Sequence, residues 1–222
     1  MKQKLFRLAN IIVYGITHIL YKTVYIVFFR MQIRGRQNMP LKGACIIASN
    51  HASFLDPPIV GTSHSREMYY FARSTLMYTP FRRILFRLLN CIPVDRQSLT
   101  MSTLKASLGV LKAGYPLLLF PEGTRSETGE LQKAKMGLGF IAHKARVPIV
   151  PFYIQGSHDI LPKGAKWPHL SKLRVNIGEA INFDHYYRQK GNDEIYQKIS
   201  DEVMNRIAAL KNELVSPANP VI

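Results

Sequence analysis

The chain contains 222 residues, 47% of them hydrophobic, and its 30 Lys and Arg residues against 14 Asp and Glu residues give a net charge of +16. The hydrophobic content excludes an intrinsically disordered chain, and the length suffices for one domain with a substantial core. Two cysteines, Cys45 and Cys91, are too few for a disulfide-stabilised secreted fold and favour a reducing compartment. So basic a protein is expected to bind an anionic partner, either nucleic acid or a phospholipid surface.

The N-terminal segment favours the phospholipid surface. Eight basic residues precede the first acidic one, Asp56, and an apolar stretch runs through residues 8–29. On a helix, seven polar residues share an arc of about 140°; they are Gln3, Lys4, Arg7, Asn10, Thr17, His18 and Lys22. A broad apolar face with a basic stripe is typical of a helix lying in the membrane interface. A spanning helix and a helix packed on its own domain are the alternatives. No basic patch with stacking aromatics stands out elsewhere, so nucleic acid is not an expected partner.

From Met31 onward, short apolar runs alternate with segments of helical periodicity. The expected strands are 44–49, 68–72, 117–120, 149–154 and 173–177, and the expected helices are 81–89, 99–112, 137–145 and 193–210. This alternation predicts an α/β fold with a central, mostly parallel or mixed sheet covered by helices, preceded by an amphipathic membrane-binding helix. We divide the chain into a membrane-associating helix (1–30), one folded domain (31–215) and a flexible tail (216–222).

Two polar residues follow the first expected strand. In α/β sheets, ligands collect in the loops beyond the carboxyl ends of the strands, and His51 and Asp56 lie in such a loop. Because Pro57 and Pro58 follow it, Asp56 is expected to be the N-cap of a short helix. The pair is also suited to general-base chemistry, in which the carboxylate fixes the imidazole tautomer and the other ring nitrogen accepts a proton. From spacing alone, a plain cap and an unrelated loop histidine remain the alternative.

A second polar loop, residues 120–126, follows another expected strand. Gly123 lies beside hydroxyl residues and would let backbone N–H groups approach an anion, while Arg125 could bind phosphate through two parallel bonds. The alternative is a simple polar turn. Arg96 ends a further apolar run and either pairs with Asp95 or provides a second phosphate contact.

Three other patterns carry no such prediction. The residues at 137–142 spell a dinucleotide-binding fingerprint, but no strand precedes them. The histidines and cysteines lack metal-ligand spacing, and Cys45 lies within an apolar run typical of a core. Ser53 has no strained elbow around it, which argues against a covalent route.

The ordered polar blocks resemble those of the 1-acyl-sn-glycerol-3-phosphate acyltransferase (lysophosphatidic acid acyltransferase) family. The N-H-x-S-x-x-D block matches Asn50, His51, Ser53 and Asp56, and residues 120–126 match F-P-E-G-T-R-S letter for letter. Residues 92–96 match the block that ends in arginine, and 147–151 match the proline-flanked aliphatic block, with Phe152 where a small aliphatic residue is commoner. The resemblance covers about residues 45–152, and residues 31–215 would then form the acyltransferase domain.

The resemblance implies an O-acyltransferase of phospholipid synthesis that makes phosphatidic acid. In the family, the histidine deprotonates the acceptor hydroxyl, which attacks the thioester of acyl carrier protein or acyl-CoA, and the aspartate orients the histidine; here these are His51 and Asp56. The residues implied to hold the acceptor's phosphate are Arg96, Glu122, Gly123, Thr124 and Arg125. Because Glu122 is itself an anion, we expect it to orient Arg125 or a hydroxyl group. No metal and no cofactor beyond the acyl thioester co-substrate is expected.

Several alternatives remain at this stage. The same blocks serve acyltransferases that use glycerol 3-phosphate, a lyso-ornithine lipid or another lysophospholipid as the acceptor. A non-catalytic, basic membrane-binding protein is the alternative from a different class, although the intact pair of His51 and Asp56 argues against it. The expected location is the cytoplasmic face of a membrane with an anionic surface.

Overall fold

The computed structural model describes residues 2–94 and 100–215. Its strands are β1 (Gln32–Arg34), β2 (Ile46–Ser49), β3 (Tyr69–Arg73), β4 (Cys91–Val94), β5 (Leu117–Leu119), β6 (Ile149–Gln155) and β7 (Arg174–Ile177). Its α-helices are α1 (Lys2–Phe29), α2 (Asp56–Ser63), α3 (Pro80–Leu88), α4 (Met101–Lys112), α5 (Gly137–Ala145), α6 (Ser157–Ile160), α7 (Asp184–Tyr187) and α8 (Asp193–Val215). Short 3-10 turns occupy Arg36–Asn38 and Ser74–Met77.

The strands form one seven-stranded sheet in the order β1-β7-β6-β2-β5-β3-β4. Every neighbouring pair is parallel except β6 and β7, so the predicted α/β fold with a mixed sheet is confirmed. The sequence patterns did not identify β1 as a strand, because three residues are too few to show a period. β4 was not among the strands expected from the apolar pattern, although the resemblance implied a hydrophobic strand at 92–96; it contains Pro93, which a sheet tolerates at its edge.

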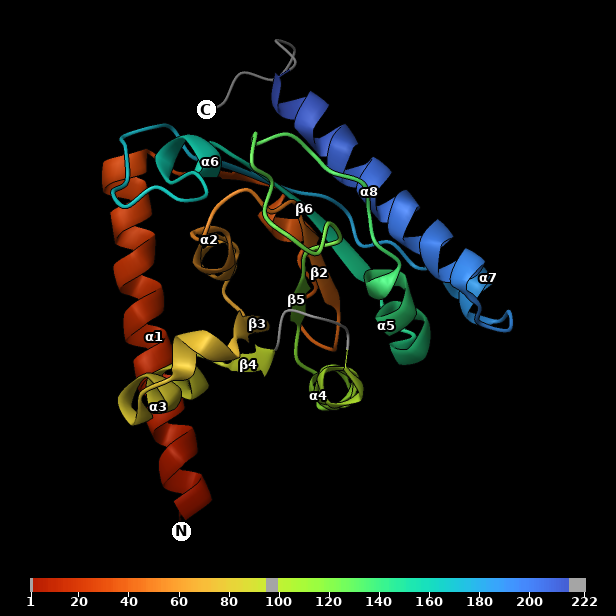
Figure 1. Ribbon diagram of the computed structural model, residues 1–222, viewed down its shortest axis with the longest axis horizontal. Coiled ribbons are helices and arrows are strands. Elements are labelled where there is room, and N and C mark those ends of the chain that lie inside the picture. Colours follow the sequence, from red (N-terminus) through yellow and green to blue (C-terminus); the bar gives the residue numbers. More distant parts are fainter. Residues whose placement is uncertain (1, 95–99, 216–222) are drawn as a thin grey trace.

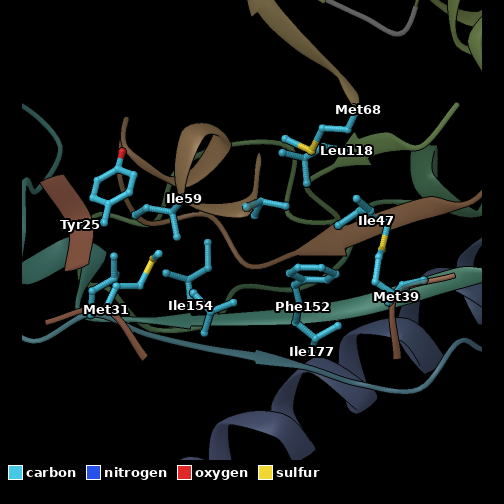
Figure 2. Packing of buried hydrophobic residues seen from close by; sticks show 14 of the residues in the cluster. Tyr25, Met31, Met39, Ile47, Ile59, Met68, Leu118, Phe152, Ile154 and Ile177 are labelled. Carbon is cyan, nitrogen blue, oxygen red and sulfur yellow. The ribbon is translucent and has the colours of Figure 1, made fainter. Parts of the chain in front are cut away.

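Helices cover both faces of the sheet (Figure 1). Alternate residues of β2 point to opposite faces, so Ile47 joins one core cluster while Ile46 and Ala48 join the other. The first cluster lies between the sheet and the helices α1 and α2; Figure 2 shows Tyr25 of α1 and Ile59 of α2 above Ile154 of β6. The second cluster lies between the sheet and α4, α5 and α8. Both faces of β2 are therefore buried, which explains its uniformly apolar sequence.

Gly137 and Gly139 lie in the first turn of α5, and Gly139 lets this helix pack closely against α8. A Cβ added at Gly139 would lie only 1.9 Å from the carbonyl oxygen of Tyr196 in α8, so only glycine allows this close approach. The backbone N–H of Gly139 also donates to Ser200 Oγ in α8 at 3.0 Å. This packing accounts for the glycine at position 139 of the pattern.

Helix α1 presents its polar arc to the protein and its apolar face outward. Arg7 forms an ion pair with Glu67 at 2.7 Å, and the side-chain amide of Asn10 donates to the Leu88 carbonyl oxygen at 2.8 Å. The outward residues include Leu8, Ile12, Ile16, Ile19 and Val27, all of which are exposed. Arg7 of the basic stripe thus has an acidic partner within the domain, Glu67.

Candidate active site

Two loops meet at the carboxyl edge of the sheet. β2 and β5 are adjacent and parallel, so the loop after β2 and the loop after β5 leave the sheet at the same edge. The backbone N–H of Ser126 donates to the His51 carbonyl oxygen at 2.7 Å and joins the two loops. The side chain of Asn50 bonds both the N–H and the carbonyl oxygen of Ile154 in β6, at 2.7 and 2.9 Å. The first loop is thus held by strand β6 on one side and by the loop after β5 on the other.

The carboxylate of Asp56 organises the first loop. Its Oδ2 atom accepts hydrogen bonds from the backbone N–H groups of Ala52 and Ser53, both at 2.7 Å, and lies 2.8 Å from His51 Nδ1. Asp56 is completely buried. A carboxylate that accepts several N–H groups is held in one orientation, so it fixes the position of the imidazole in turn.

The expectation that Asp56 is the N-cap of its helix is wrong. Asp56 is the first residue of α2, its carboxylate bonds the preceding loop, and Leu55 occupies the cap position. Pro57 and Pro58 have no N–H to offer, and the N–H of Ile59 donates to the Leu55 carbonyl oxygen at 3.0 Å. The start of the helix therefore leaves no donor for the carboxylate, which is available to the loop and to His51.

The imidazole of His51 contacts the Asp56 carboxylate through one of its two ring nitrogens. A short contact from Nδ1 to a carboxylate assigns the ring proton to Nδ1 and leaves the lone pair on Nε2. The ring stacks on Phe120 with centroids 3.8 Å apart and planes inclined by 12°. The side chain is 17% exposed, so solvent or substrate can reach it. Phe120 lies outside the site residues that we predicted, although it belongs to the second block.

Glu122 supports the first loop from the second. Its Oε1 accepts the backbone N–H of His51 at 3.0 Å, and its Oε2 accepts a hydrogen bond from Gln132 Nε2 at 2.9 Å. Burial raises the pKa of the Glu122 carboxyl, and the hydrogen bonds from His51 and Gln132 partly offset this. In the described part of the chain Glu122 does not contact Arg125 or a hydroxyl group, so the expectation that it orients one of them is wrong; it bonds the His51 N–H and Gln132 instead. No pattern in the sequence pointed to Gln132.

The remaining residues of the second loop form an open, basic corner. Gly123 has a φ of +70° and is exposed together with Thr124. Arg125 is half-buried, and no hydrogen bond or ion pair within residues 2–94 and 100–215 engages its guanidinium. Lys135 lies against Gly123, with its Nζ 3.4 Å from where a Cβ would be. Lys135 was not predicted, and Arg96 lies outside the described residues.

Two potential nucleophiles are already engaged or buried. Ser53 Oγ donates to the Leu161 carbonyl oxygen at 2.8 Å, accepts from the N–H of Leu55 at 3.2 Å, and is buried. Burial raises the pKa of the Cys45 thiol to about 11, which keeps it protonated at neutral pH. Neither side chain therefore combines a free polar atom with access to solvent, as the imidazole of His51 does.

The fold and this site define a class: an α/β domain with a buried carboxylate, an oriented histidine and a basic loop at one edge of a mixed sheet. A family model described as Acyltransferase matches residues 30–155, and the chain belongs to this family.

The chain is similar to proteins named 1-acyl-sn-glycerol-3-phosphate acyltransferase. A chloroplastic one from Brassica napus is 30% identical over 189 residues, and the match covers 83% of this chain and 52% of that protein. One from Bacillus subtilis is 24% identical over 188 residues, covering 83% of this chain and 89% of the other. The chain thus spans about half the length of the Brassica relative.

The fold is shared with a solved structure. The crystal structure of the 1-acyl-sn-glycerophosphate acyltransferase PlsC from Thermotoga maritima superposes with a TM-score of 0.68 at 23% identity, covering 93% of this chain and 98% of that one.

Proposed function

We propose that this protein transfers a fatty acyl group from an acyl thioester to the free hydroxyl of 1-acyl-sn-glycerol 3-phosphate, giving phosphatidic acid. The main support is the 2.8 Å contact between His51 Nδ1 and Asp56 Oδ2 beside an exposed, glycine-containing basic loop. That arrangement combines a base for a hydroxyl group with a place for the phosphate of the same substrate. The names of the relatives support the choice of acceptor.

In the proposed mechanism, His51 Nε2 accepts the proton of the acceptor hydroxyl as its oxygen attacks the thioester carbonyl carbon. Asp56 stabilises the imidazolium that forms. When the tetrahedral intermediate collapses, the C–S bond breaks and the imidazolium returns the proton to the departing thiolate, so the histidine is regenerated. A positioned general base typically contributes about 10²- to 10⁴-fold to the rate.

An acyl-transfer assay with the purified protein tests this proposal. The acceptors are 1-acyl-sn-glycerol 3-phosphate, glycerol 3-phosphate, a lyso-ornithine lipid and a lysophosphatidylcholine, each with acyl-CoA and with acyl carrier protein as the acyl donor. We expect the highest kcat/KM with 1-acyl-sn-glycerol 3-phosphate. A higher value with another acceptor would reassign the substrate, and no transfer to any of them would contradict the proposal.

Within this proposal, Arg125, Thr124 and Gly123 bind the acceptor's phosphate, together with Arg96. Replacing Arg125 with alanine should raise the KM for 1-acyl-sn-glycerol 3-phosphate by roughly 10- to 100-fold, the loss typical of a charge-assisted pair. A monoacylglycerol acceptor, which has no phosphate, should show little further loss with this variant. Arg188→Ala, an exposed arginine following α7, is the matched control. An equal loss with both acceptors would show that Arg125 does not bind the phosphate.

We further propose that α1 lies in the membrane interface and does not span the bilayer. It is long and apolar enough to cross a membrane, with only 6% of its most apolar window buried. However, its polar arc binds the domain: Tyr25 is buried in the core, and Tyr14 accepts the N–H of Met68 through its hydroxyl at 3.2 Å. A spanning orientation would break these contacts, whereas an interfacial one keeps them and covers the exposed apolar face.

Labelling on sealed vesicles separates the two orientations. Cysteines replacing the exposed residues Lys4 and Lys42 should both react with an impermeant thiol reagent added outside, because an interfacial helix leaves both on one side. The native Cys45 and Cys91 are buried and should stay unlabelled. Reaction at Lys42 but not at Lys4 until the vesicles are opened would establish a spanning helix and contradict the interfacial orientation.

Within the same proposal, the protein acts at the cytoplasmic face of the membrane. Its two cysteines are unpaired and buried, which suits a reducing compartment. Both proposed acyl donors, acyl carrier protein and acyl-CoA, are soluble thioesters that would reach the site from the same side as the domain.

A further inference from the structure

Helix α3 exposes an apolar edge that the described chain does not cover. The nine residues Pro80–Leu88 alternate apolar residues with three arginines, and none of the nine is buried. Phe81 is 74% exposed and Ile84 is 56% exposed. In a water-soluble domain, an amphipathic helix normally turns its apolar face to the core. The exposed apolar residues of α3 therefore indicate that the outer side of this helix contacts something other than water.

The position of Phe86 establishes which side of α3 faces the core. Phe86 packs beside the small cluster of Ala72, Met77 and Cys91. At 100° per residue, the midpoint between Phe81 and Ile84 lies about 170° away from Phe86 around the helix. The exposed edge of α3 therefore points away from the cluster that anchors the helix.

The charged residues of α3 itself are all positive. Arg82, Arg83 and Arg87 are exposed, and residues 68–94 contain no Asp or Glu. Tyr78 is 67% exposed, and the Arg82 guanidinium lies 4.7 Å from the centre of its ring. Exposed aromatic rings beside arginines suit the headgroup level of an anionic leaflet, where the ring contacts lipid and the cation contacts phosphate.

The C-terminal end of α3 is adjacent to α1. Asn10 of α1 donates to the Leu88 carbonyl oxygen at 2.8 Å and to Asn90 Oδ1 at 2.9 Å, and Figure 1 shows α3 beside the N-terminal half of α1. A membrane that covers the outer face of α1 would thus be within reach of α3.

We propose that α3 is a second membrane-contact element, which inserts Phe81 and Ile84 into the leaflet that α1 occupies and places Arg82, Arg83 and Arg87 against anionic headgroups. This inference rests on the interfacial position of α1 proposed above. Two non-collinear contacts would fix the rotation of the domain about the α1 axis, which a single helix would leave undetermined. The active-site edge would then keep one orientation relative to the surface that holds the lipid substrate.

A charge-matched comparison tests the arginines. The variant R82Q/R83Q/R87Q and the control R188Q/K190Q/R206Q each lower the net charge from +16 to +13, and the control residues are exposed at the α7–α8 end of the protein, on the other side of the sheet from α1 (Figure 1). Binding is measured by sedimentation with phosphatidylcholine–phosphatidylglycerol vesicles at low salt. From the per-charge attraction to an anionic leaflet, we expect the α3 variant to bind the vesicles about 100-fold more weakly than the unmodified protein. The control variant should lose much less affinity. Equal losses would show that only net charge matters and would overturn the proposal.

Tryptophan quenching tests insertion directly. The single native tryptophan is replaced (W167F), and one new tryptophan is introduced as F81W in α3, I16W in α1 or N205W in α8. With vesicles that contain brominated phospholipid, we expect quenching of F81W and I16W but not of N205W. Quenching of I16W alone would overturn the role of α3 and leave that of α1 intact, whereas quenching of neither would contradict both. A spectral blue shift of F81W on self-association without lipid would assign the edge to a second copy of the chain.

Discussion

Replacing His51 with alanine is expected to lower kcat for acyl transfer by at least about 100-fold while the protein stays folded. The ring lies partly open to solvent, and its contacts are the Asp56 carboxylate and the face of Phe120. The backbone bonds of His51, to Glu122 and Ser126, do not involve the side chain and remain. The substitution therefore removes the base and leaves the loop that holds it.

The matched control is His185→Ala, which removes an exposed histidine of α7. Both variants should unfold within a few degrees of the unmodified protein, and only His51→Ala should lose turnover. Added imidazole should restore part of the lost rate, because a diffusible base can occupy the space that the ring leaves. Turnover close to that of the unmodified protein in a folded His51→Ala variant would remove His51 from the mechanism.

The elements that the sequence predicted correctly are those with a long apolar period or a continuous apolar run. The helix expected at 137–145 has the predicted bounds, and the one expected at 193–210 begins where predicted and continues to Val215. The central strands β2, β5 and β6 are buried on both faces and show as apolar runs. Strands β1 and β4 lie at the two sheet edges; β1 has three residues and shows no apolar run, and β4 is a short apolar run that contains a proline.

The orientation of α1 could not follow from its own residues. The pattern located the polar arc, but an arc of Arg, Asn and His can face headgroups, water or protein equally well. Its partners lie far along the chain: Glu67 is 60 residues from Arg7, and Asn90 is 80 residues from Asn10. Only the tertiary fold brings these groups together, so the side that faces outward was open until the fold was known.

Distance along the chain also decides which contacts of the candidate site could be predicted from the sequence. His51 and Asp56 are five residues apart in one loop, and local spacing sufficed to pair them. The contact from Glu122 to the His51 backbone joins residues 71 positions apart, and the placement of Lys135 against Gly123 depends on how the second loop returns. A block of letters identifies such residues as a set without saying which of them touches the substrate and which positions the base.

Replacing Asp56 with asparagine is expected to lower kcat by about 100-fold or more with a much smaller effect on folding. The amide oxygen can still accept the N–H groups of Ala52 and Ser53, so the loop keeps its hydrogen bonds. The amide nitrogen would take the place of Oδ1, which is buried and has no hydrogen-bond partner in the described part of the chain. What the amide lacks is the negative charge that stabilises the imidazolium of His51 during proton transfer.

Asparagine is a sharper test than alanine at this position. Alanine would leave two buried N–H groups without an acceptor, at a cost of roughly 1–3 kcal/mol for each, and would confuse loss of fold with loss of chemistry. Asp184→Asn, an exposed aspartate that opens α7, controls for the change of charge. The measurements are kcat, acceptor KM and thermal unfolding of the three proteins. Asp56→Asn should lose kcat with little change in KM, because the carboxylate acts on the base and does not touch the acceptor. Retention of kcat within about threefold would show that Asp56 only shapes the loop, since loss of its charge should remove far more of the rate.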